Sequence, residues 1–499
     1  MSSYGQILRA SALIGGATAV NLAVGLMRTK ALALLLGPAG IGLIGIFTSI
    51  ADVARSVAQL GINGSGVRQI AEAVASGDEQ RVARTVIVLR RTAIVLGLLG
   101  MAGLIACSRP VSVWAFGSAD HASPIAWLSV AVFFRLVADG QAALFQGMRR
   151  IGDLARVGML GALAGSMVSV ALAAWLGEAG VVPGLVAAAA LAMVISWWTA
   201  RRVYVPPLQM TASQVRSEAG HLLKLGLAFM TSAILMTAAA FTVRAIVMRA
   251  GGLDAAGLYQ AAWTLGGMYV GFVLQAMGTD FYPRLVGVAS DADASNQAVN
   301  QQAQVSLLLA GPGVIATMVL ATQILAAFYS ADFVAAEPVL RWICFGMALR
   351  VISWPMGYIL LALNRRLLFF GAELAWCVVN VGLSWICVQR FGLLGAGIAF
   401  FVSYVFHCLM IYAIVRRLQG FRWERAIWTH IMYFVCAIST VFVGGAFVPA
   451  PWSTAAGALV VCAAVAHSLL ALARLAPEVL PASVRRLLAA VSRAMERLR

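Results

Sequence analysis

Ionisable side chains inside long apolar stretches are the residues of this chain best suited to chemistry. The basic ones are Arg28, Lys30, Arg55, Arg135, Arg244, Arg341 and Arg350, and the acidic ones are Asp52, Asp139, Asp280 and Glu373. A charge at the centre of a membrane-spanning helix costs ~3 kcal/mol, so such residues usually face a bundle interior or a water-filled cavity. Guanidinium groups in a cavity of this kind can hold phosphate or diphosphate oxygens through paired hydrogen bonds.

The spacing of these residues divides them into two groups. We predict that an anionic headgroup is bound by arginines, namely Arg28, Arg244, Arg55, Arg135 and Arg350. Arg28 has Asn21 and Gly25 on its own helical face. Gating, ion coupling or charge pairing is predicted for Lys30, Asp52, Asp139 and Asp280.

Simpler structural roles stay open for several of these charges. Arg135 and Asp139 are four residues apart and can pair with each other, and Lys30 can pair with Asp52. Arg341 and Glu373 lie near the starts of their apolar stretches, so we expect both to extend toward the membrane interface.

The apolar stretches that carry these charges are membrane spans. Hydrophobic residues make up 62% of the 499 residues and charged residues only 11%, whereas a soluble domain has ~25% charged residues. Runs of ~20 apolar residues are the length that a helix needs to cross the hydrocarbon. We therefore predict an all-α polytopic membrane protein with about 14 transmembrane helices.

The charges outside the spans predict the orientation and explain the net charge of +17. Placing both termini in the cytoplasm puts most loop arginines on the inner side, as the positive-inside rule requires. Because membrane topology explains the net positive charge, we predict no nucleic acid partner. Residues 476–499 have apolar residues at helical spacing and arginines elsewhere on the wheel, which predicts a basic amphipathic helix on the inner leaflet.

An internal repeat of about 215 residues predicts the domain organisation. Arg28 matches Arg244, Arg135 matches Arg350, and Arg149-Arg150 matches Arg365-Arg366. Because each copy has an even number of spans, the copies have the same orientation and form two pseudo-symmetric six-helix lobes. The predicted parts are an N-terminal lobe at 1–215, a C-terminal lobe at 216–420, two appended helices at 421–475 and the tail at 476–499.

Signs of an enzyme or of a cofactor are missing from the sequence. It has no phosphate-binding Gly-x-x-x-x-Gly-Lys-Ser/Thr motif and no His-Glu-x-x-His motif. Its seven cysteines are scattered singly and its five histidines lack metal-ligand spacing. We predict a transporter that is not an enzyme, without a cofactor or a metal.

Short motifs in a fixed order give the chain a family resemblance. They are Leu36-Gly37-Pro38-Ala39-Gly40-Ile41-Gly42, Gly61-Ile62-Asn63-Gly64, Ala256-Gly257-Leu258-Tyr259-Gln260 and Asp280-Phe281-Tyr282-Pro283-Arg284-Leu285. In these motifs the chain resembles the Wzx-type polysaccharide flippases, which carry O-antigen and other lipid-linked oligosaccharides and belong to the MOP (MATE-like) exporter superfamily. Gly25-Leu26-Met27-Arg28 is also similar to the Gly-x-x-Arg of the related peptidoglycan-lipid flippases.

The resemblance implies a substrate and a location. The substrate would be an undecaprenyl-pyrophosphate-linked oligosaccharide, moved by alternating access from the cytoplasmic to the periplasmic leaflet of the bacterial inner membrane for polysaccharide biosynthesis. Membrane lipids are expected partners, and a polysaccharide polymerase and export proteins are further candidates. Two alternatives stay open: a MATE-like multidrug or cation exporter of the same fold, and a membrane-embedded polysaccharide polymerase or ligase.

Overall fold

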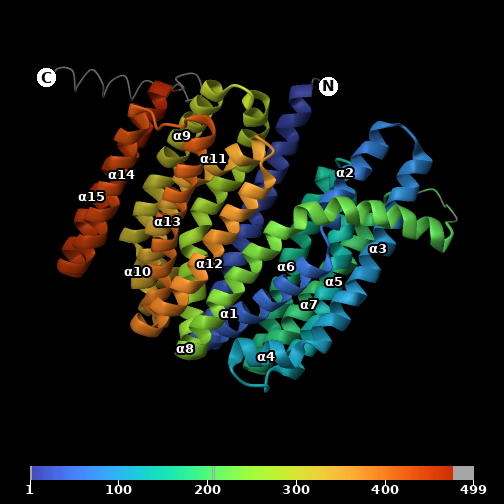
Figure 1. Cartoon of the computed structure of the whole chain (residues 1–499). Coiled ribbons are helices and arrows are strands. Elements are labelled where there is room, and N and C mark those ends of the chain that lie inside the picture. Colours follow the sequence, from blue (N-terminus) through green and yellow to red (C-terminus); the bar gives the residue numbers. More distant parts are fainter. Residues whose placement is uncertain (1–2, 205, 207, 209, 476–499) are drawn as a thin grey trace. The chain divides into compact units, whose positions relative to one another are not determined.

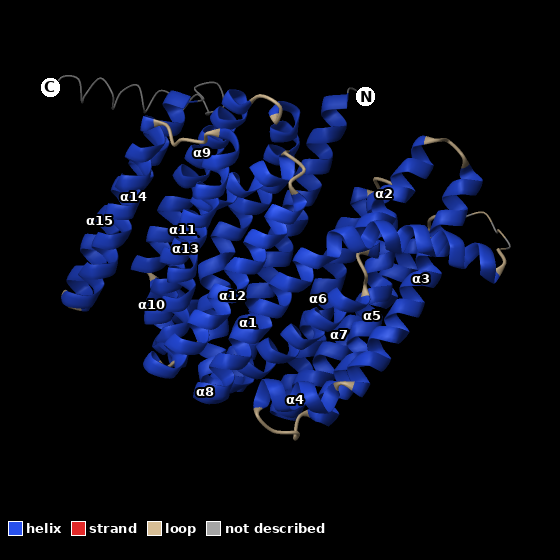
Figure 2. Cartoon of the chain, viewed as in Figure 1, coloured by secondary structure: helices blue, strands red, loops and turns tan. Residues whose placement is uncertain are grey.

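The computed structural model describes residues 3–475 except 205, 207 and 209, and every element within these residues is a helix (Figures 1 and 2). The first elements are α1 (Ser3–Ala58), α2 (Ile62–Ala75), α3 (Glu79–Ala106), α4 (Ser108–Phe116), α5 (Ala122–Gly147), α6 (Ile151–Leu176), η1 (Gly177–Gly180) and α7 (Val181–Ala200). They are followed by α8 (Ala212–Val288), α9 (Ala292–Val319), α10 (Ala321–Phe328), η2 (Ala331–Ala336), α11 (Glu337–Ala362), α12 (Arg366–Phe391), α13 (Leu393–Gln419), α14 (Arg425–Phe447) and α15 (Ala450–Leu475). The predicted amphipathic tail at 476–499 lies outside the described residues.

Eleven helical segments in the described part of the chain are long and apolar enough to cross a membrane. Three of them, Gly16–Ala58, Ile151–Ala200 and Met230–Gln275, have 43, 50 and 46 residues, whereas ~20 residues are enough for one crossing. Each of the three is interrupted, at Gly37, at η1 and at Gly252 respectively, so each can provide two crossings. The predicted all-α polytopic fold with about 14 spans is confirmed.

The interruptions at Gly37 and Gly252 have nearly the same backbone geometry. Gly37 has φ 63° and ψ −167°, and Gly252 has φ 76° and ψ −172°. L-residues avoid this region, which glycine enters without a β-carbon clash. The two glycines occupy corresponding positions in the predicted repeat, so the repeat extends to the shape of the backbone.

Two further turns repeat in the same way. Arg149 and Asn364, at corresponding positions before α6 and α12, have φ values of 55° and 56°. Gly177 after α6 and Gly392 after α12 have φ and ψ values of 59° and −138°, and of 57° and −141°. Local chain geometry therefore supports an ancestral duplication.

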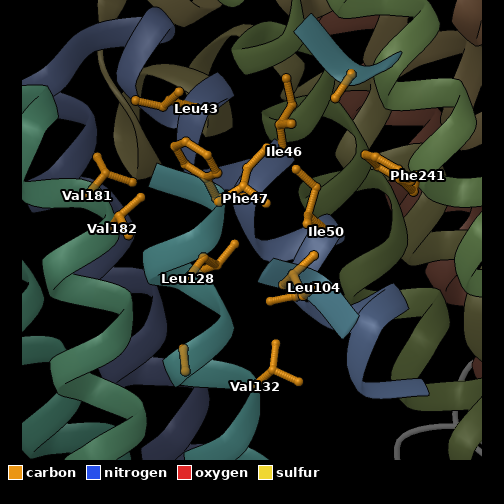
Figure 3. Packing of buried hydrophobic residues seen from close by; sticks show 14 of the residues in the cluster. Leu43, Ile46, Phe47, Ile50, Leu104, Leu128, Val132, Val181, Val182 and Phe241 are labelled. Carbon is orange, nitrogen blue, oxygen red and sulfur yellow. The ribbon is translucent and has the colours of Figure 1, made fainter. Parts of the chain in front are cut away.

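The first compact unit comprises residues 1–260 and 326–333. Within it α5 packs against α2, α3 and α7, and α1 packs against α5 and α6. Side chains mainly from α1, α5 and α7 form an apolar cluster in this unit, with Phe47, Leu128 and Val182 among them (Figure 3). This packing fixes the rotation of α1 and α5, and thus which of their polar side chains meet.

The second compact unit comprises residues 261–325 and 334–499. Its centre is α13, which packs against α11 and α12, while α9 packs against α11. The predicted appended helices, α14 and α15, both pack on α9 and on each other. Gly311 of α9 allows this contact, because a β-carbon there would overlap the ring of Phe434 in α14.

The boundary between the compact units does not coincide with the predicted lobe boundary at 215/216. The first part of α8, up to Gln260, groups with the first unit. Arg244 therefore lies in the same compact unit as Arg28, although the repeat assigns it to the second copy. The division into sequence lobes stays a prediction.

Candidate functional site

Two ion pairs connect α1 with α5 inside the first unit. Arg55 Nη1 lies 3.0 Å from Asp139 Oδ2, and Arg135 Nη1 lies 3.1 Å from Asp52 Oδ1. Each helix thus supplies one arginine and one aspartate, and the pairs cross between the helices. The four side chains are 25–36% exposed, so they are not sealed in a core.

The crossed pairing corrects two expectations about these charges. Arg135 pairs with Asp52 rather than with Asp139 of its own helix, and Asp52 is therefore not paired with Lys30. Lys30 Nζ instead donates a hydrogen bond to the Ala326 carbonyl oxygen at 2.8 Å. Spacing shows which side chains of one helix share a face, but the residues with which they pair depend on how neighbouring helices are rotated.

Arg28 lies beside this pair of ion pairs. Its charge acts on that of Arg135, and burial in apolar surroundings separates it from water. The Arg28 Nε–H is buried and has no hydrogen-bond partner. A buried donor without a partner costs about 1–3 kcal/mol. This unpaired N–H therefore favours the binding of a ligand that supplies a hydrogen-bond acceptor, such as a phosphate oxygen.

Arg244 is held differently from its repeat partner. Its Nε donates to Gln260 Oε1 at 2.9 Å, and its Nη1 donates to the Ala240 carbonyl oxygen at 3.1 Å. The position that corresponds to Gln260 in the first copy is Gly45, and Gln260 lies directly over it: a β-carbon on Gly45 would be 3.1 Å from Gln260 Oε1. The missing side chain at Gly45 therefore makes room for the glutamine that orients Arg244.

Arg28, Asp52, Arg55, Arg135, Asp139 and Arg244 together form what we call the arginine–aspartate cluster. Besides the two ion pairs, the charges of Asp52 and Arg244 interact, as do those of Arg135 and Asp139. Four arginines face two aspartates, so the cluster has two positive charges in excess. An assembly whose only purpose was to join helices would need no such excess, whereas a site for a doubly charged anion would.

Two of the predicted site residues lie elsewhere. Asp280 forms an ion pair with Arg284 one turn along α8, and both side chains are well exposed, at 71% and 64%. Arg350 belongs to the second unit. Neither residue is part of the arginine–aspartate cluster, and their predicted roles in gating and headgroup binding stay predictions.

Arg350 lies in a polar and aromatic group of α11, α12 and α13 within the second unit. Its guanidinium carbon is 5.1 Å from the ring centroid of Trp354 and 6.0 Å from that of Tyr404. The charge of Arg350 also acts on Glu373 and His407. Sequence reasoning did not select the aromatic residues or His407 for this site, although Trp354 lies four residues after Arg350 on the same helical face.

Glu373 corrects the expectation that it extends to the membrane interface. It is only 8% exposed, and its Oε2 has no hydrogen-bond partner. Its place in the repeat corresponds to Gly158 of the first copy, which carries no charge. Arg341, the other residue expected to extend toward the interface, forms an ion pair with Glu337 one turn earlier in α11, with 2.7 Å between Arg341 Nη2 and Glu337 Oε1.

The fold and the buried charges define a class of protein. Many apolar helices, two copies of a helical unit and cationic side chains within the spans characterise a multi-pass membrane transporter. More particularly, residues 31–338 match the model of a family described as polysaccharide biosynthesis protein. This match covers more than half of the chain, and the chain belongs to this family.

Two curated relatives agree with the family match. The lipid III flippases of Escherichia coli (strain K12) and of Shigella flexneri are each 23% identical to this chain over 428 residues. Each alignment covers 83% of this chain and 99% of the relative. The sequence-based recognition of a MOP-superfamily flippase is confirmed.

Solved structures show the same fold at low sequence identity. The lipid II flippase MurJ in an inward closed conformation has a TM-score of 0.71 and 13% identity, covering 93% of this chain and 99% of MurJ. An inward-facing multidrug resistance MATE transporter has a TM-score of 0.59 and 18% identity, covering 81% of this chain and 99% of the transporter. The fold is therefore shared by lipid flippases and multidrug transporters, and the chemistry of the site must separate them.

Proposed function

We propose that the chain moves an undecaprenyl-pyrophosphate-linked oligosaccharide from the cytoplasmic to the periplasmic leaflet of the inner membrane. The observation that carries the proposal is the arginine–aspartate cluster with its two excess positive charges. A diphosphate is the part of such a lipid that is most costly to bring into an apolar medium. The lipid tail can stay in the bilayer while the arginines replace the water around the diphosphate.

The two aspartates would give the cluster a defined state without substrate. Asp52 and Asp139 each form an ion pair with one arginine, which reduces the repulsion between the neighbouring guanidinium groups. An arriving diphosphate would bind first to the unfilled donor of Arg28 and to Arg244, and would then compete with the aspartates for Arg55 and Arg135. Release on the other side would restore the two ion pairs, so the site can cycle.

The transport step itself follows from the repeated architecture. Rocking of parallel repeats around a site near the bilayer midplane exposes that site to each side in turn. The cytoplasmic placement of both termini, proposed from the positive-inside rule, would let the cluster load from the inner leaflet. The lipid III flippases among the relatives support a lipid as cargo, and the description of the family as polysaccharide biosynthesis protein supports a sugar on that lipid. A polymerase in the periplasm would then receive it.

The test is a flipping assay with the purified chain in liposomes that contain a lipid-diphosphate-linked oligosaccharide. The Arg28→Gln, Arg244→Gln double variant should flip at least ~10-fold more slowly, because each lost charge-assisted hydrogen bond is worth ~1.5–3 kcal/mol. The matched control is Arg68→Gln on α2, whose partner is Glu72 and whose side chain is 62% exposed. Unchanged flipping in the double variant would overturn the proposal.

The same liposomes can decide between a flippase and a MATE-like cation exporter. A site that binds organic cations needs acidic side chains, and in this cluster the arginines outnumber the aspartates. We therefore expect no uptake of a permeant organic cation. Uptake that persists in Arg28→Ala would favour the exporter.

A further inference from the structure

A cationic cavity lies in the first unit, and no residue of the arginine–aspartate cluster lines it. It has a volume of about 630 Å³ and is bounded by α3, α5 and α7. Its polar lining consists of Arg90 on α3, Gln141 on α5 and Arg201 just after α7. The rest of its lining is apolar and includes Phe133, Val137 and Val194.

The cavity is a groove whose floor is α5 and whose walls are α3 and α7. Helices α5 and α3 approach closely because each has a glycine where the other helix contacts it. A β-carbon on Gly140 of α5 would be 2.9 Å from Ala93 Cβ, and one on Gly97 of α3 would be 2.9 Å from the Phe133 ring. The rim is exposed, with Ile94 at 42% and Val194 at 50%. These exposed rim residues are apolar and lie on spanning helices, as a groove that opens toward the acyl chains of the bilayer requires.

The polar groups of the groove lack protein partners for several of their atoms. Arg90 Nε and Gln141 Oε1 are buried without a hydrogen-bond partner, and Gln141 is only 4% exposed. The guanidinium of Arg201 stacks on Trp197, with 3.5 Å between its carbon and the ring centroid. A stacked guanidinium keeps its N–H edge free for an oxyanion. The residues that line the cavity include no Asp or Glu that could neutralise the arginines.

The position of Arg201 puts these groups at headgroup depth. Helix α7 has 20 residues, which correspond to ~30 Å and therefore to the thickness of the hydrocarbon. Arg201 is the first residue after it, where the apolar region ends. Basic pockets between transmembrane helices at this depth are suited to anionic lipid headgroups.

We propose that this groove binds one anionic phospholipid of the phosphatidylglycerol type. Arg90 and Arg201 hold its phosphate, the Gln141 amide binds a glycerol hydroxyl, and one acyl chain lies along Phe133, Val137 and Val194. Phosphatidylglycerol fits because no ammonium group offsets the negative charge of its phosphate beside the two arginines, and its headgroup supplies hydroxyl donors for a buried amide oxygen. The site is separate from the transported substrate and would anchor the first unit to its lipid surroundings.

Native mass spectrometry of the full chain, released from nanodiscs of mixed phosphatidylglycerol and phosphatidylethanolamine, tests the proposal. The wild type should retain a phosphatidylglycerol adduct, and the Arg90→Gln, Arg201→Gln variant should retain at least ~10-fold less of this adduct. The control is Arg202→Gln: this neighbouring arginine lies over Trp198, at 5.0 Å, and does not line the cavity. Equal retention of both lipids by the wild type, or undiminished retention by the double variant, would overturn the proposal.

A second variant separates the lipid from a free phosphate and guards against misfolding of the first. Val194→Trp keeps both arginines and should fill the acyl part of the groove, so it should reduce the lipid adduct as well. Inorganic phosphate added to the release buffer should not displace the lipid from the wild type. Retention by Val194→Trp, or displacement by inorganic phosphate alone, would mean that the groove is not a lipid site.

Discussion

Gly42 and Gly257 lie against each other in the first unit, and each touches the backbone of the opposite segment. A β-carbon on Gly42 would overlap the Leu253 carbonyl oxygen, and one on Gly257 would overlap the Pro38 carbonyl oxygen. Pro38 corresponds to Leu253 in the repeat, as Gly42 corresponds to Gly257, so the contact is symmetric. The contact between these equivalent turns of the two copies therefore has local two-fold symmetry.

Substitutions at this contact should lower stability. In Gly42→Ala or Gly257→Ala the added methyl must push two backbones apart, which we expect to cost ~1–3 kcal/mol. Gly103→Ala is the control, because a β-carbon at this position of α3 has no neighbour within 4 Å. Thermal unfolding in detergent should show a lower Tm for the two contact variants, with Gly103→Ala at the wild-type value or above it. Equal Tm values for all three would argue against the contact.

The crossed ion pairs make a prediction about coupling energies. A double-mutant cycle of Arg55→Gln with Asp139→Asn should give a coupling of ~0.5–1 kcal/mol, since the pair is bonded but partly exposed. The cycle of Arg135→Gln with Asp139→Asn should give a smaller coupling, because these residues share a helix but are not hydrogen-bonded. Chemical unfolding in mild detergent measures both cycles. A larger coupling energy for Arg135 with Asp139 than for Arg55 with Asp139 would instead support an ion pair within α5.

The length of the apolar runs was sufficient to predict the helical fold and the number of spans. Gly37, which belongs to one of the motifs that carry the family resemblance, interrupts α1 with a positive φ. These features are encoded locally, because a run of ~20 apolar residues has few stable conformations in lipid. The family resemblance rested on the same local motifs.

The partners of the site residues could not be predicted in the same way. Asp52 meets Arg135 across 83 residues, and that contact depends on how α1 and α5 are rotated against each other. Glu373 was expected at the membrane interface because it comes eight residues into α12, but packing against α13 buries it. The orientation of Arg244 by Gln260 likewise required the space above Gly45.

The polar group of the second unit predicts an asymmetric response to mutation. Arg350→Leu removes the positive charge that acts on the buried Glu373, so the folded state must either hold this carboxyl uncharged or bury an uncompensated charge, and we expect a lower Tm. The double variant Arg350→Leu, Glu373→Leu removes both charges and should recover much of that loss. Thermal unfolding of the two variants checks this expectation. A double variant no more stable than the single one would show that Glu373 does not depend on Arg350.

The hydrogen bond between Gln260 and Arg244 predicts graded effects on transport. Gln260→Ala frees the Arg244 Nε but keeps its charge, so flipping in liposomes should fall only several-fold. Gln260→Glu places a carboxylate on the same nitrogen and cancels part of the excess positive charge, so it should impair flipping about as much as Arg244→Gln, ~10-fold. The isosteric glutamate preserves the shape of the site, which separates charge from packing. If Gln260→Glu transported as well as the wild type, the charge of Arg244 would have no part in holding the diphosphate.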